Sequence, residues 1–250
     1  MPRKIIRLLE VLNEPDAFRQ FIKLRNRFSI SSFHINRMIS NYQPIFHTVI
    51  DAGANVGQFA LAAAQRFPMA DIHCFEPVPD VCEILKKNTK KISKIHIYNC
   101  AVGDISGKIK FHRNDYTPAS SAMAIQGDMK EHNRANCQTQ HTKTIEVDVF
   151  KIDDLVSTFS INVKKPVLLK LDVQGYEKKT IQGAVKTLES IDYIVLEATF
   201  VKLYENQPLF DELHEMLHNI NFEFIAPLDV NVGINKSIVE MDILYKRKNL

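Results

Sequence analysis

From Thr48 onward, short apolar segments alternate with amphipathic ones, and this alternation limits the folds that the chain can adopt. Five segments have the length and composition of strands: Thr48–Ala52, Asp71–Phe75, Lys94–Ala101, Val167–Asp172 and Asp192–Glu197. The fourth is apolar at four of the five positions from Val167 to Leu171, as expected of a strand covered on both faces. Strands of this kind joined by helices predict a parallel sheet with helices on both faces.

Amphipathic segments follow the first two and the last two of these strands. The predicted helices are Gln58–Phe67, Val81–Ile92, Glu177–Ser190 and Leu209–Ile220. Two more strands, Phe222–Ala226 and Ile238–Tyr245, are joined by a short loop, so the last strand runs antiparallel to its neighbour. The sequence therefore predicts a Rossmann-like α/β fold with a seven-stranded, mostly parallel sheet whose last strand is antiparallel.

The first part of the chain has a different pattern. In residues 1–46, apolar side chains recur at helical spacing, as at Ile5, Leu8, Leu9 and Leu12. They predict an N-terminal helical extension that caps one domain over residues 47–250. Arg7 and Glu10 interrupt the first apolar run, which therefore lacks the unbroken stretch of a signal peptide. No later segment approaches a membrane span, and we expect a cytoplasmic protein.

A long polar segment, Asn114–Lys143, interrupts the alternation of strands and helices. Lys108–Arg113 and Thr144–Val149 flank it and have the pattern of a hairpin. Polar loops of this length in a compact domain are usually functional or disordered. Two interpretations stay open: a disordered surface loop, or a substrate loop over residues 114–143 that covers a polyhydroxylated molecule. The candidate contacts in the second interpretation are Ser120, Ser121, His132 and His141.

The composition argues against several classes of protein. The 250 residues include 32 basic and 29 acidic side chains, and a net charge of +3 gives no basic footprint for nucleic acid. The lysines between Lys86 and Lys94 have helical spacing and indicate a solvated face. The four cysteines form no Cys-x-x-Cys pair and predict buried thiols in a reducing compartment, not a zinc site or a disulfide. They are Cys74, Cys82, Cys100 and Cys137.

The segment from Val49 to Gly57 carries the sharpest functional signal. An apolar strand ends in Asp51 and in a turn that contains Gly53, which permits close approach of a ligand to the backbone. The helix that follows offers unpaired N–H groups at its N-terminus. Position 55 is Asn, so the Gly-x-Gly-x-x-Gly pattern of dinucleotide sites is absent. We expect Asp51 to bind the amino group of an amino-acid ligand and the turn to bind its carboxylate; a plain strand–helix turn is the alternative.

The ends of the second and third strands predict a nucleoside site. Glu76 follows the glycine turn by about 20 residues, where an acid binds ribose hydroxyls in nucleotide-binding sheets. Pro77 ends that strand and keeps the acid at the sheet edge; a surface glutamate is the alternative. At the third strand, Ala101 and Val102 suit an adenine ring, and Asp104 is a candidate partner for its amino group.

The fourth and fifth strands end in carboxylates, Asp172 and Glu197. Ligands bind beyond the carboxyl ends of the strands in open parallel sheets. If the two strands are neighbours, the side-by-side carboxylates could raise one pKa or hold a hard cation. We assign no metal to the pair, and a bound cation is kept as the alternative.

These segments together resemble the FkbM-type methyltransferase family. The motifs that carry the resemblance are Asp-x-Gly-Ala-Asn-x-Gly at 51–57, Phe-Glu-Pro at 75–77, Asn-x-Ala-Val-Gly-Asp at 99–104 and Lys-x-Asp-Val-Gln-Gly-Tyr-Glu at 170–177. The stretch 197–210 also resembles the sequence pattern of the family, and the similarity covers Thr48 to Tyr245. Residues 1–46 stay outside it.

The resemblance implies the class I methyltransferase fold and S-adenosylmethionine as the cofactor, with S-adenosylhomocysteine as product. It implies that the cofactor is bound by Asp51, Gly53, Asn55, Gly57 and Glu76. The other strand ends and turns add Ala54, Pro77, Ala101, Val102, Asp104 and Asp172. The usual activity of the family is O-methylation of sugars or natural products, so we expect a small-molecule acceptor that is methylated on a hydroxyl.

The roles of the two carboxylates follow from the chemistry of a hydroxyl acceptor. We expect Asp172 to be the general base, with Glu197 as second choice; the alternative is that Asp172 only orients the donor or a loop.

Two other functions of the protein are kept open. A nicotinamide-dependent oxidoreductase is disfavoured because position 55 is not glycine and no Tyr-x-x-x-Lys pair is present. The second alternative function is a non-catalytic nucleoside-binding module. A homodimer is also compatible with the sequence.

The run His214-Glu215-Met216-Leu217-His218 satisfies the His-Glu-x-x-His pattern of zinc proteases. Both histidines would share one helix face, so the geometry is possible. The same helix nevertheless has an apolar stripe for packing on the sheet, and no third ligand with a convincing motif follows. We therefore expect no zinc site. The stripe consists of Leu209, Leu213, Leu217 and Ile220.

Overall fold

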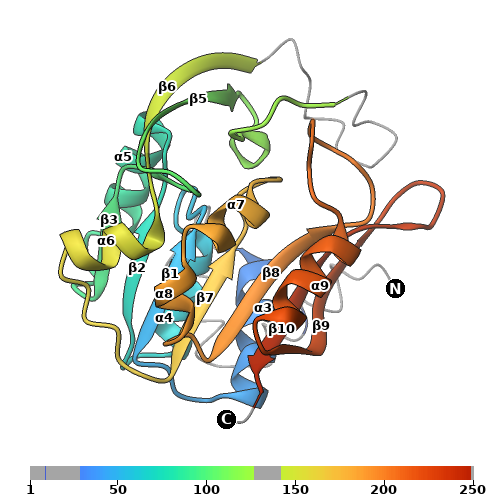
Figure 1. Ribbon diagram of the computed structural model, residues 1–250. Coiled ribbons are helices and arrows are strands. Elements are labelled where there is room, and N and C mark those ends of the chain that lie inside the picture. Colours follow the sequence, from blue (N-terminus) through green and yellow to red (C-terminus); the bar gives the residue numbers. More distant parts are fainter. Residues whose placement is uncertain (1–8, 10–28, 127–141, 249–250) are drawn as a thin grey trace.

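The computed structural model describes Leu9 and residues 29–126 and 142–248 (Figure 1). Predictions for most of residues 1–28, and those for His132, Cys137 and His141, lie outside the described residues. The part of the N-terminal extension that is described contains the helix α3 (Ile30–Tyr42).

A seven-stranded sheet forms the centre of the fold (Figure 1). Its order is β3 (Ile95–Tyr98), β2 (Asp71–Phe75), β1 (Thr48–Ala52), β7 (Val167–Leu171), β8 (Tyr193–Thr199), β10 (Ile238–Arg247) and β9 (Phe222–Val232). The strands from β3 to β8 are parallel, and β10 runs antiparallel to both of its neighbours. The predicted mostly parallel sheet with an antiparallel last strand is confirmed.

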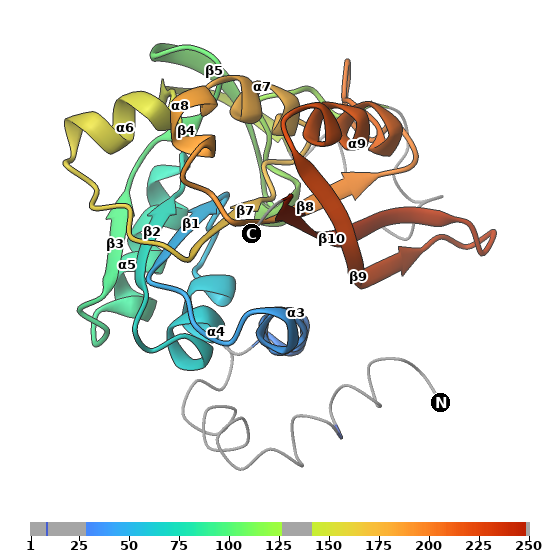
Figure 2. The same ribbon diagram turned by 60° about the horizontal axis from the view of Figure 1, so that its bottom comes forward.

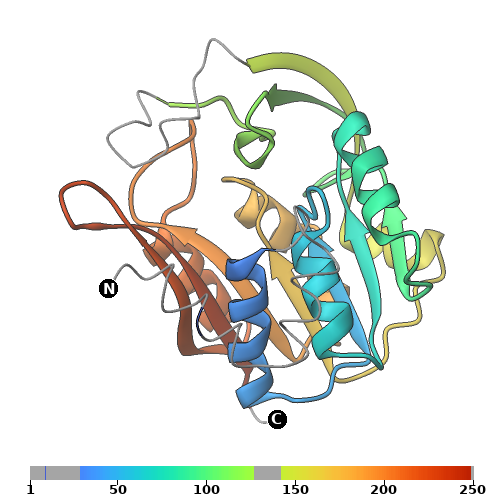
Figure 3. The same cartoon turned by 180° about the vertical axis from the view of Figure 1, so that it is seen from behind.

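Helices cover both faces of the sheet, as predicted (Figures 2 and 3). One face carries α3, α4 (Gln58–Arg66) and α5 (Pro79–Thr89). The other carries α6 (Ile152–Thr158), α7 (Glu177–Gln182), α8 (Val185–Leu188) and α9 (Phe210–Asn219). Among the described residues, no helix has both the length and the apolar character to cross a membrane.

The two helical layers enclose two apolar cores. On the side of α6–α9, Ile50 of β1 and Leu169 of β7 pack in one core. On the side of α3–α5, Val49 of β1 and Leu168 of β7 pack in the other. Because side chains alternate along a strand, residues two positions further along point to the same face. Asp51 and Lys170 therefore follow Val49 and Leu168 toward the α3–α5 side, at the carboxyl ends of their strands.

A small second sheet stands beside the carboxyl ends of the main strands (Figure 1). It has the order β4 (Ala101–Val102), β6 (Thr142–Phe150) and β5 (Gly107–Asn114). β5 and β6 are antiparallel, which confirms the predicted hairpin. After β5 the chain continues through the 3-10 helix η2 (Thr117–Ala119) and forms isolated bridges through Ser121 and Ile125. We call residues 115–126 the acceptor segment.

Two predicted elements are each divided into two in the structure. The predicted strand Lys94–Ala101 is divided into β3 and β4, which belong to different sheets. The predicted helix Glu177–Ser190 is divided at Gly183 into α7 and α8. The backbone of Gly183 lies against that of Gly103, and a Cβ atom at position 183 would lie 1.8 Å from the carbonyl oxygen of Gly103. Only glycine fits at this break between the two helices.

Candidate active site

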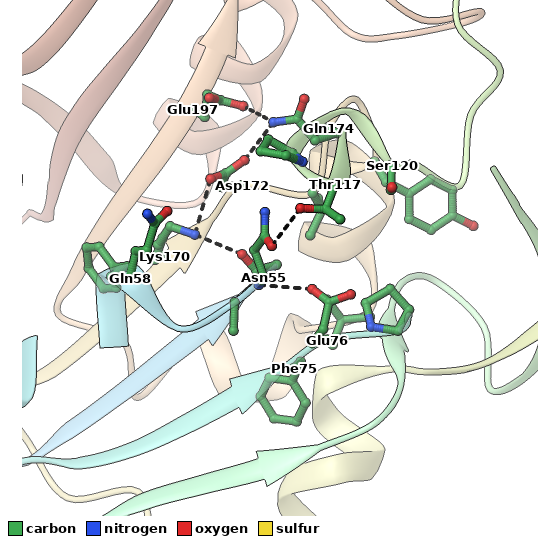
Figure 4. A pocket seen from close by; sticks show the side chains of 18 of the residues that line it. Asn55, Gln58, Phe75, Glu76, Thr117, Ser120, Lys170, Asp172, Gln174 and Glu197 are labelled. Carbon is green, nitrogen blue, oxygen red and sulfur yellow. Dashed lines mark hydrogen bonds and ion pairs between the residues drawn. The ribbon is translucent and has the colours of Figure 1, made fainter. Parts of the chain in front are cut away.

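A cavity of about 430 Å³ opens at the carboxyl ends of β1, β2, β7 and β8. This volume lies within the range of small-molecule sites. Residues from the two ends of the chain meet there, because α3, the glycine turn after β1, the acceptor segment and β10 all contribute to its wall. Figure 4 shows Asn55 and Glu76 on one side of the cavity and Asp172, Gln174 and Glu197 on the other.

The glycine turn forms one wall of the cavity. Gly53 has a positive φ of 81°, and a Cβ atom there would lie 1.8 Å from the carbonyl oxygen of Asp172. The turns after β1 and β7 therefore touch through their backbones, which requires glycine at this position. Ala54 and Asn55 line the cavity beside it. Gly57, with a φ of 89°, begins α4 behind this wall and does not line the cavity.

Glu76 holds the glycine turn in place. Its Oε2 accepts a hydrogen bond from the backbone N–H of Asn55 at 2.9 Å, and its Oε1 accepts one from Val78 at 2.9 Å. The side chain is 5% exposed, and burial raises the pKa of Glu76 to about 7, although both hydrogen bonds oppose the shift. Each carboxylate oxygen has a further lone pair, so Glu76 still has acceptor capacity toward the cavity.

The wall next to Glu76 is apolar. Phe75, Pro77, Ala101 and Val102 line it, as does Cys100. Cys74, Cys82 and Cys100 are free thiols, and their predicted burial is confirmed. Asp104 does not line the cavity, because its carboxylate turns to Lys179, whose Nζ lies 3.1 Å from Oδ2. Its predicted contact with an adenine amino group stays a prediction.

Lys170 connects the turn after β1 with the turn after β7. Its Nζ lies 3.1 Å from Oδ1 of Asp51 and 3.3 Å from Oδ2 of Asp172, and it donates to the carbonyl oxygen of Gly53 at 3.2 Å. Burial opposes the charged form of Lys170, but Asp172 and Asp51 outweigh it and raise its pKa. Asp51 is fully buried beneath the cavity wall, so its predicted contact with a cofactor amino group is not part of this geometry and stays a prediction.

Asp172 and Glu197 lie together, as expected of neighbouring strand ends. Leu171 pairs with Leu196 in the parallel register, which places the next residues side by side at the mouth of the cavity. The side-chain amide of Gln174 donates to Oδ1 of Asp172 at 2.8 Å and to Oε2 of Glu197 at 2.6 Å. Burial opposes ionisation of Asp172, but the charge of Lys170 and the hydrogen bonds with Glu197, Gln174 and Lys170 outweigh it and lower the pKa of Asp172.

Further polar groups line the side of the cavity away from Glu76. They belong to α3, β9 and β10 and include Ser31, Ser32, Asn231, Glu240 and Asp242. Asp242 lies opposite Glu197 in the antiparallel pair of β8 and β10. Burial, followed by the nearby carboxylates Asp172, Asp229 and Glu240, raises the pKa of Asp242 well above its usual range. This end of the cavity is therefore acidic and rich in hydrogen-bond acceptors.

The acceptor segment closes the cavity from above. Tyr116, Thr117 and Ser120 line the cavity, and the hydroxyl of Thr117 donates to Oδ1 of Asn55 at 3.2 Å. Ser120 therefore lines the cavity, and its contact with an acceptor stays a prediction. Ser121 is fully buried, and its hydroxyl donates to the carbonyl oxygen of Gln174, so it does not face the cavity.

The His-Glu-x-x-His run lies on α9, away from the cavity. Nδ1 of His214 lies 3.1 Å from the hydroxyl of Tyr245, and Nε2 of His218 lies 3.0 Å from Nζ of Lys248. Leu213 and Leu217 of the same helix pack in the core, as predicted for the apolar stripe. Within residues 29–126 and 142–248, no cluster of three or more His, Cys, Asp or Glu side chains has the geometry of a metal site.

Residues 51–224 match the family described as the methyltransferase FkbM domain. The chain is 26% identical over 224 residues to the 2-O-methyltransferase NoeI of Sinorhizobium fredii, a match that covers 88% of each chain. It is 28% identical over 148 residues to the hexuronic acid methyltransferase AglP of Haloferax volcanii, covering 59% of this chain and 54% of AglP. The family match decides against the nicotinamide-dependent oxidoreductase.

The fold agrees with the family match. The structure of magnesium protoporphyrin IX methyltransferase (ChlM) from Synechocystis, solved with S-adenosylmethionine, superposes with a TM-score of 0.50. The superposition covers 99% of this chain and 92% of ChlM at 8% identity, so the likeness concerns the fold. The seven-stranded order with an antiparallel strand next to the edge is the class I methyltransferase arrangement.

The residues of the cavity suit S-adenosylmethionine. The cofactor carries ribose hydroxyls and a flat base, together with an ammonium group, a carboxylate and a methyl-bearing sulfonium. Glu76 offers acceptor capacity for hydroxyls, and Phe75, Ala101 and Val102 offer an apolar surface for a ring. The chain belongs to the FkbM methyltransferase family and is an S-adenosylmethionine-dependent methyltransferase.

Proposed function

We propose that this enzyme methylates a hydroxyl oxygen of a saccharide or of another small, polyhydroxylated acceptor. The observation that carries the proposal is that one cavity joins the Glu76 wall to the carboxylates Asp172 and Glu197. Ionised carboxylates only accept hydrogen bonds, so this end of the cavity suits hydroxyl donors. Two relatives, the 2-O-methyltransferase NoeI and the hexuronic acid methyltransferase AglP, support an oxygen acceptor and a sugar.

The cofactor lies, in this proposal, along the wall that the sequence motifs identify. The amino-acid part of the cofactor lies along the glycine turn at Gly53, Ala54 and Asn55, with the start of α4 at Gly57 behind it. The N–H groups of these three turn residues already donate to Phe75 and Glu76. Glu76 receives the ribose hydroxyls, and Pro77, Ala101 and Val102 flank the adenine. When bound, S-adenosylmethionine supplies a methyl group on a sulfonium, which needs no further activation.

The protein's own contribution is to hold the acceptor and to take up one proton. Alignment of two reactants at attack distance contributes on the order of 7–11 kcal/mol. As the O–CH₃ bond forms and the S–CH₃ bond breaks, the hydroxyl proton passes to a carboxylate, and the products are a methyl ether and S-adenosylhomocysteine. Asp172 is the first candidate for this base and Glu197 the second. Lys170 keeps Asp172 ionised and therefore able to accept the hydrogen of the hydroxyl.

An acceptor panel with [methyl-¹³C]S-adenosylmethionine tests the proposal. The panel contains neutral hexoses, amino sugars, uronic acids and simple alcohols, and product methyl groups are identified by ¹³C NMR. We expect an O-methyl signal on at least one sugar, together with one S-adenosylhomocysteine per methyl transferred. Methyl groups found only on nitrogen or carbon would contradict the proposal. Cofactor binding without product on any acceptor of the panel would also contradict the proposal.

The nature of the partners and of the cellular setting stays as predicted from the sequence. We propose a small-molecule acceptor and a cytoplasmic enzyme, with a homodimer as the candidate assembly. We also propose that the N-terminal extension takes part directly in the site, because Ser31, Ser32 and Ile35 of α3 line the cavity.

A further inference from the structure

Gln174 forms a bridge between the two carboxylates of the acceptor end. Its Nε2 lies 2.8 Å from Oδ1 of Asp172 and 2.6 Å from Oε2 of Glu197 (Figure 4). A side-chain amide has two N–H donors on one nitrogen, so a single group serves both carboxylates. Gln174 is 9% exposed and lines the cavity. One neutral amide therefore links the side chains of Asp172 and Glu197.

Tyr204 fixes the orientation of this amide. Its hydroxyl donates to Oε1 of Gln174 at 2.9 Å, and the residue is completely buried. The hydroxyl donates from one side, while the carboxylates only accept on the other, so a rotated amide would place its oxygen against two negative charges. Gln207 in turn holds Tyr204, since its Oε1 accepts the backbone N–H groups of Leu203 and Tyr204 at 2.9 and 3.2 Å.

The backbone of Gln174 is held as tightly as its side chain. Its φ is 54°, in the left-handed region that non-glycine residues seldom occupy. The buried carboxylate of Glu177 accepts the N–H groups of Val173 and Gly175, on both sides of Gln174, at 3.1 and 3.2 Å. A strained conformation persists only where the surroundings determine it, and such positions cluster at functional sites.

The acceptor segment is attached to the same bridge. The hydroxyl of Ser121 donates to the backbone carbonyl of Gln174 at 2.6 Å, and the hydroxyl of Tyr204 lies 3.3 Å from the carbonyl oxygen of Ala119. Ile125 forms an isolated β-bridge with Tyr204. The segment that closes the cavity and the pair of carboxylates below it therefore share one point of attachment.

We propose that Gln174 and Tyr204 are positioning residues, which hold Asp172 and Glu197 side by side as hydrogen-bond acceptors and set the acceptor segment above them. The inference rests on the proposed function, because it assigns the carboxylate pair to the acceptor hydroxyl. Neither residue needs to touch the reacting atoms: Gln174 acts through the two carboxylates, and Tyr204 acts through Gln174.

Other charged groups also face the pair and must stay unchanged in a test. Lys170 of β7 contacts Asp172 directly, and Asp51 of β1 lies on the other side of that lysine. The remaining carboxylates that act on the pair or on its neighbour Asp242 are Glu177 after β7, Asp229 of β9 and Glu240 of β10. A test variant should therefore alter the bridge and leave Lys170 and all of these carboxylates in place.

Two variants meet this condition. Gln174→Asn keeps an amide and a residue that tolerates a positive φ, but it shortens the side chain by one methylene and so separates the two hydrogen bonds. Tyr204→Phe removes only the hydroxyl. The matched control is Tyr245→Phe, which deletes another hydroxyl from a fully buried tyrosine whose partner is His214, away from the cavity.

The first readout does not depend on turnover. The carboxyl ¹³C signals of Asp172 and Glu197 are titrated in the complex with S-adenosylhomocysteine, with Asp172→Asn and Glu197→Gln used for assignment. We expect the apparent pKa values of the pair to rise by about one unit in Gln174→Asn and by less in Tyr204→Phe, because donors to the anions are lost or loosened. If Asp172 and Glu197 titrate in both variants as they do in the wild type, the inference is overturned.

The second readout separates positioning from folding. We expect kcat to fall on the order of tenfold or more in Gln174→Asn and Tyr204→Phe, with the Kd of S-adenosylmethionine unchanged within about threefold. Tyr245→Phe should titrate and turn over like the wild type. An equal loss of kcat in Tyr245→Phe would contradict the assignment. If the pair titrates as expected but no hydroxyl acceptor is methylated by the wild type, the bridge is established and the proposed function fails.

Discussion

Lys170 of β7 and Asp51 of β1 lie directly opposite each other in the central strand pair, with Nζ 3.1 Å from Oδ1. The register of the parallel strands places them together, because both point toward the α3–α5 side of the sheet. The same ammonium group also reaches the carbonyl of Gly53 and the carboxylate of Asp172. One buried cation thus joins the cofactor turn to the acceptor end of the cavity.

Replacing Lys170 by Met should destabilise the fold strongly. The variant leaves Asp51 buried without its cation, and removal of one partner from a buried ion pair costs about 3–5 kcal/mol. Urea unfolding of the two proteins measures the difference. The control is Lys108→Met, whose ion pair with Glu146 is exposed and is worth about 0–1 kcal/mol. Equal losses in the two variants would show that the buried pair has no special role.

Glu76 should make the stability of the wild type fall as the pH rises. Burial raises its pKa from 4.5 to about 7, so the folded state binds a proton more tightly than the unfolded state. A raised pKa contributes stability below about pH 4.5, and this contribution is lost as the pH rises through 7. Glu76→Gln lacks the titration. Its unfolding free energy should therefore rise relative to the wild type by about 3 kcal/mol over this range.

Urea unfolding at a series of pH values checks this prediction. Glu83→Gln is the control, because Glu83 is exposed and its pKa is lowered by its hydrogen bond with Lys86. No rise relative to the wild type is expected in that variant. A Glu76→Gln difference that stays flat between pH 4.5 and 7 would show that Glu76 is ionised in the folded state throughout.

Gly53→Ala should disturb the site more than its backbone strain alone explains. Alanine at a positive φ costs about 1–3 kcal/mol, and here its Cβ would also lie 1.8 Å from the carbonyl oxygen of Asp172. Gly107→Ala is the matched control, since Gly107 also has a positive φ but no neighbour within 4 Å of a Cβ. We expect Gly53→Ala alone to lose affinity for S-adenosylmethionine, as measured by isothermal titration. Similar affinities in the two variants would contradict the close contact of the two turns.

The charge of the acceptor end should select among sugars. The carboxyl groups of Asp172, Glu197 and Glu240 all line this end of the cavity. Like charges opposite each other are unfavourable, and a bound anion would add to the repulsion. We expect kcat/KM for neutral or amine-bearing sugars to exceed that for uronic acids more than tenfold. Glu240→Gln should narrow the ratio, because Glu240 lines this end of the cavity. A uronic acid as the best acceptor would contradict the prediction.

The sequence predicts the centre of the fold well, because local pattern and tertiary environment agree there. The predicted strands Thr48–Ala52 and Asp71–Phe75 coincide with β1 and β2. The prediction ended the strand that begins at Phe222 before Pro227, whereas β9 continues to Val232. Proline is tolerated there because β9 is an edge strand, and the register shifts after Asp242, where Pro227 pairs with Ile243.

The errors at other elements come from contacts between residues far apart in the sequence. The run Lys94–Ala101 has the composition of a single strand, but the side chain of Asn99 donates to the carbonyl oxygens of Glu76 and Pro77 and turns the chain between β3 and β4. The helix after Tyr176 is divided because Gly183 packs on Gly103. Neither contact has a signal in the local sequence.

The same distinction applies to the site. Glu76, Asn55, Asp172 and Glu197 follow strand ends in the sequence, and the structure brings them to one cavity. Lys170 had a signal, because it is the charged residue in an otherwise apolar strand. The spacing of residues gives no signal for the roles of Gln174 and Tyr204, because these residues are 30 positions apart in the sequence and meet only in the fold. Tyr204 also stands in a stretch without periodicity.

The most direct test of the account compares two variants by isothermal titration with S-adenosylmethionine and by steady-state turnover on the best acceptor of the panel. Glu76→Ala should lose cofactor binding. Asp172→Asn should bind the cofactor within about threefold of the wild type and turn over about 10²–10⁴-fold more slowly. Thermal unfolding of each variant verifies that it is folded. If Asp172→Asn turns over like the wild type, or loses cofactor affinity in the same proportion as turnover, the division of the cavity into a cofactor wall and an acceptor end is contradicted.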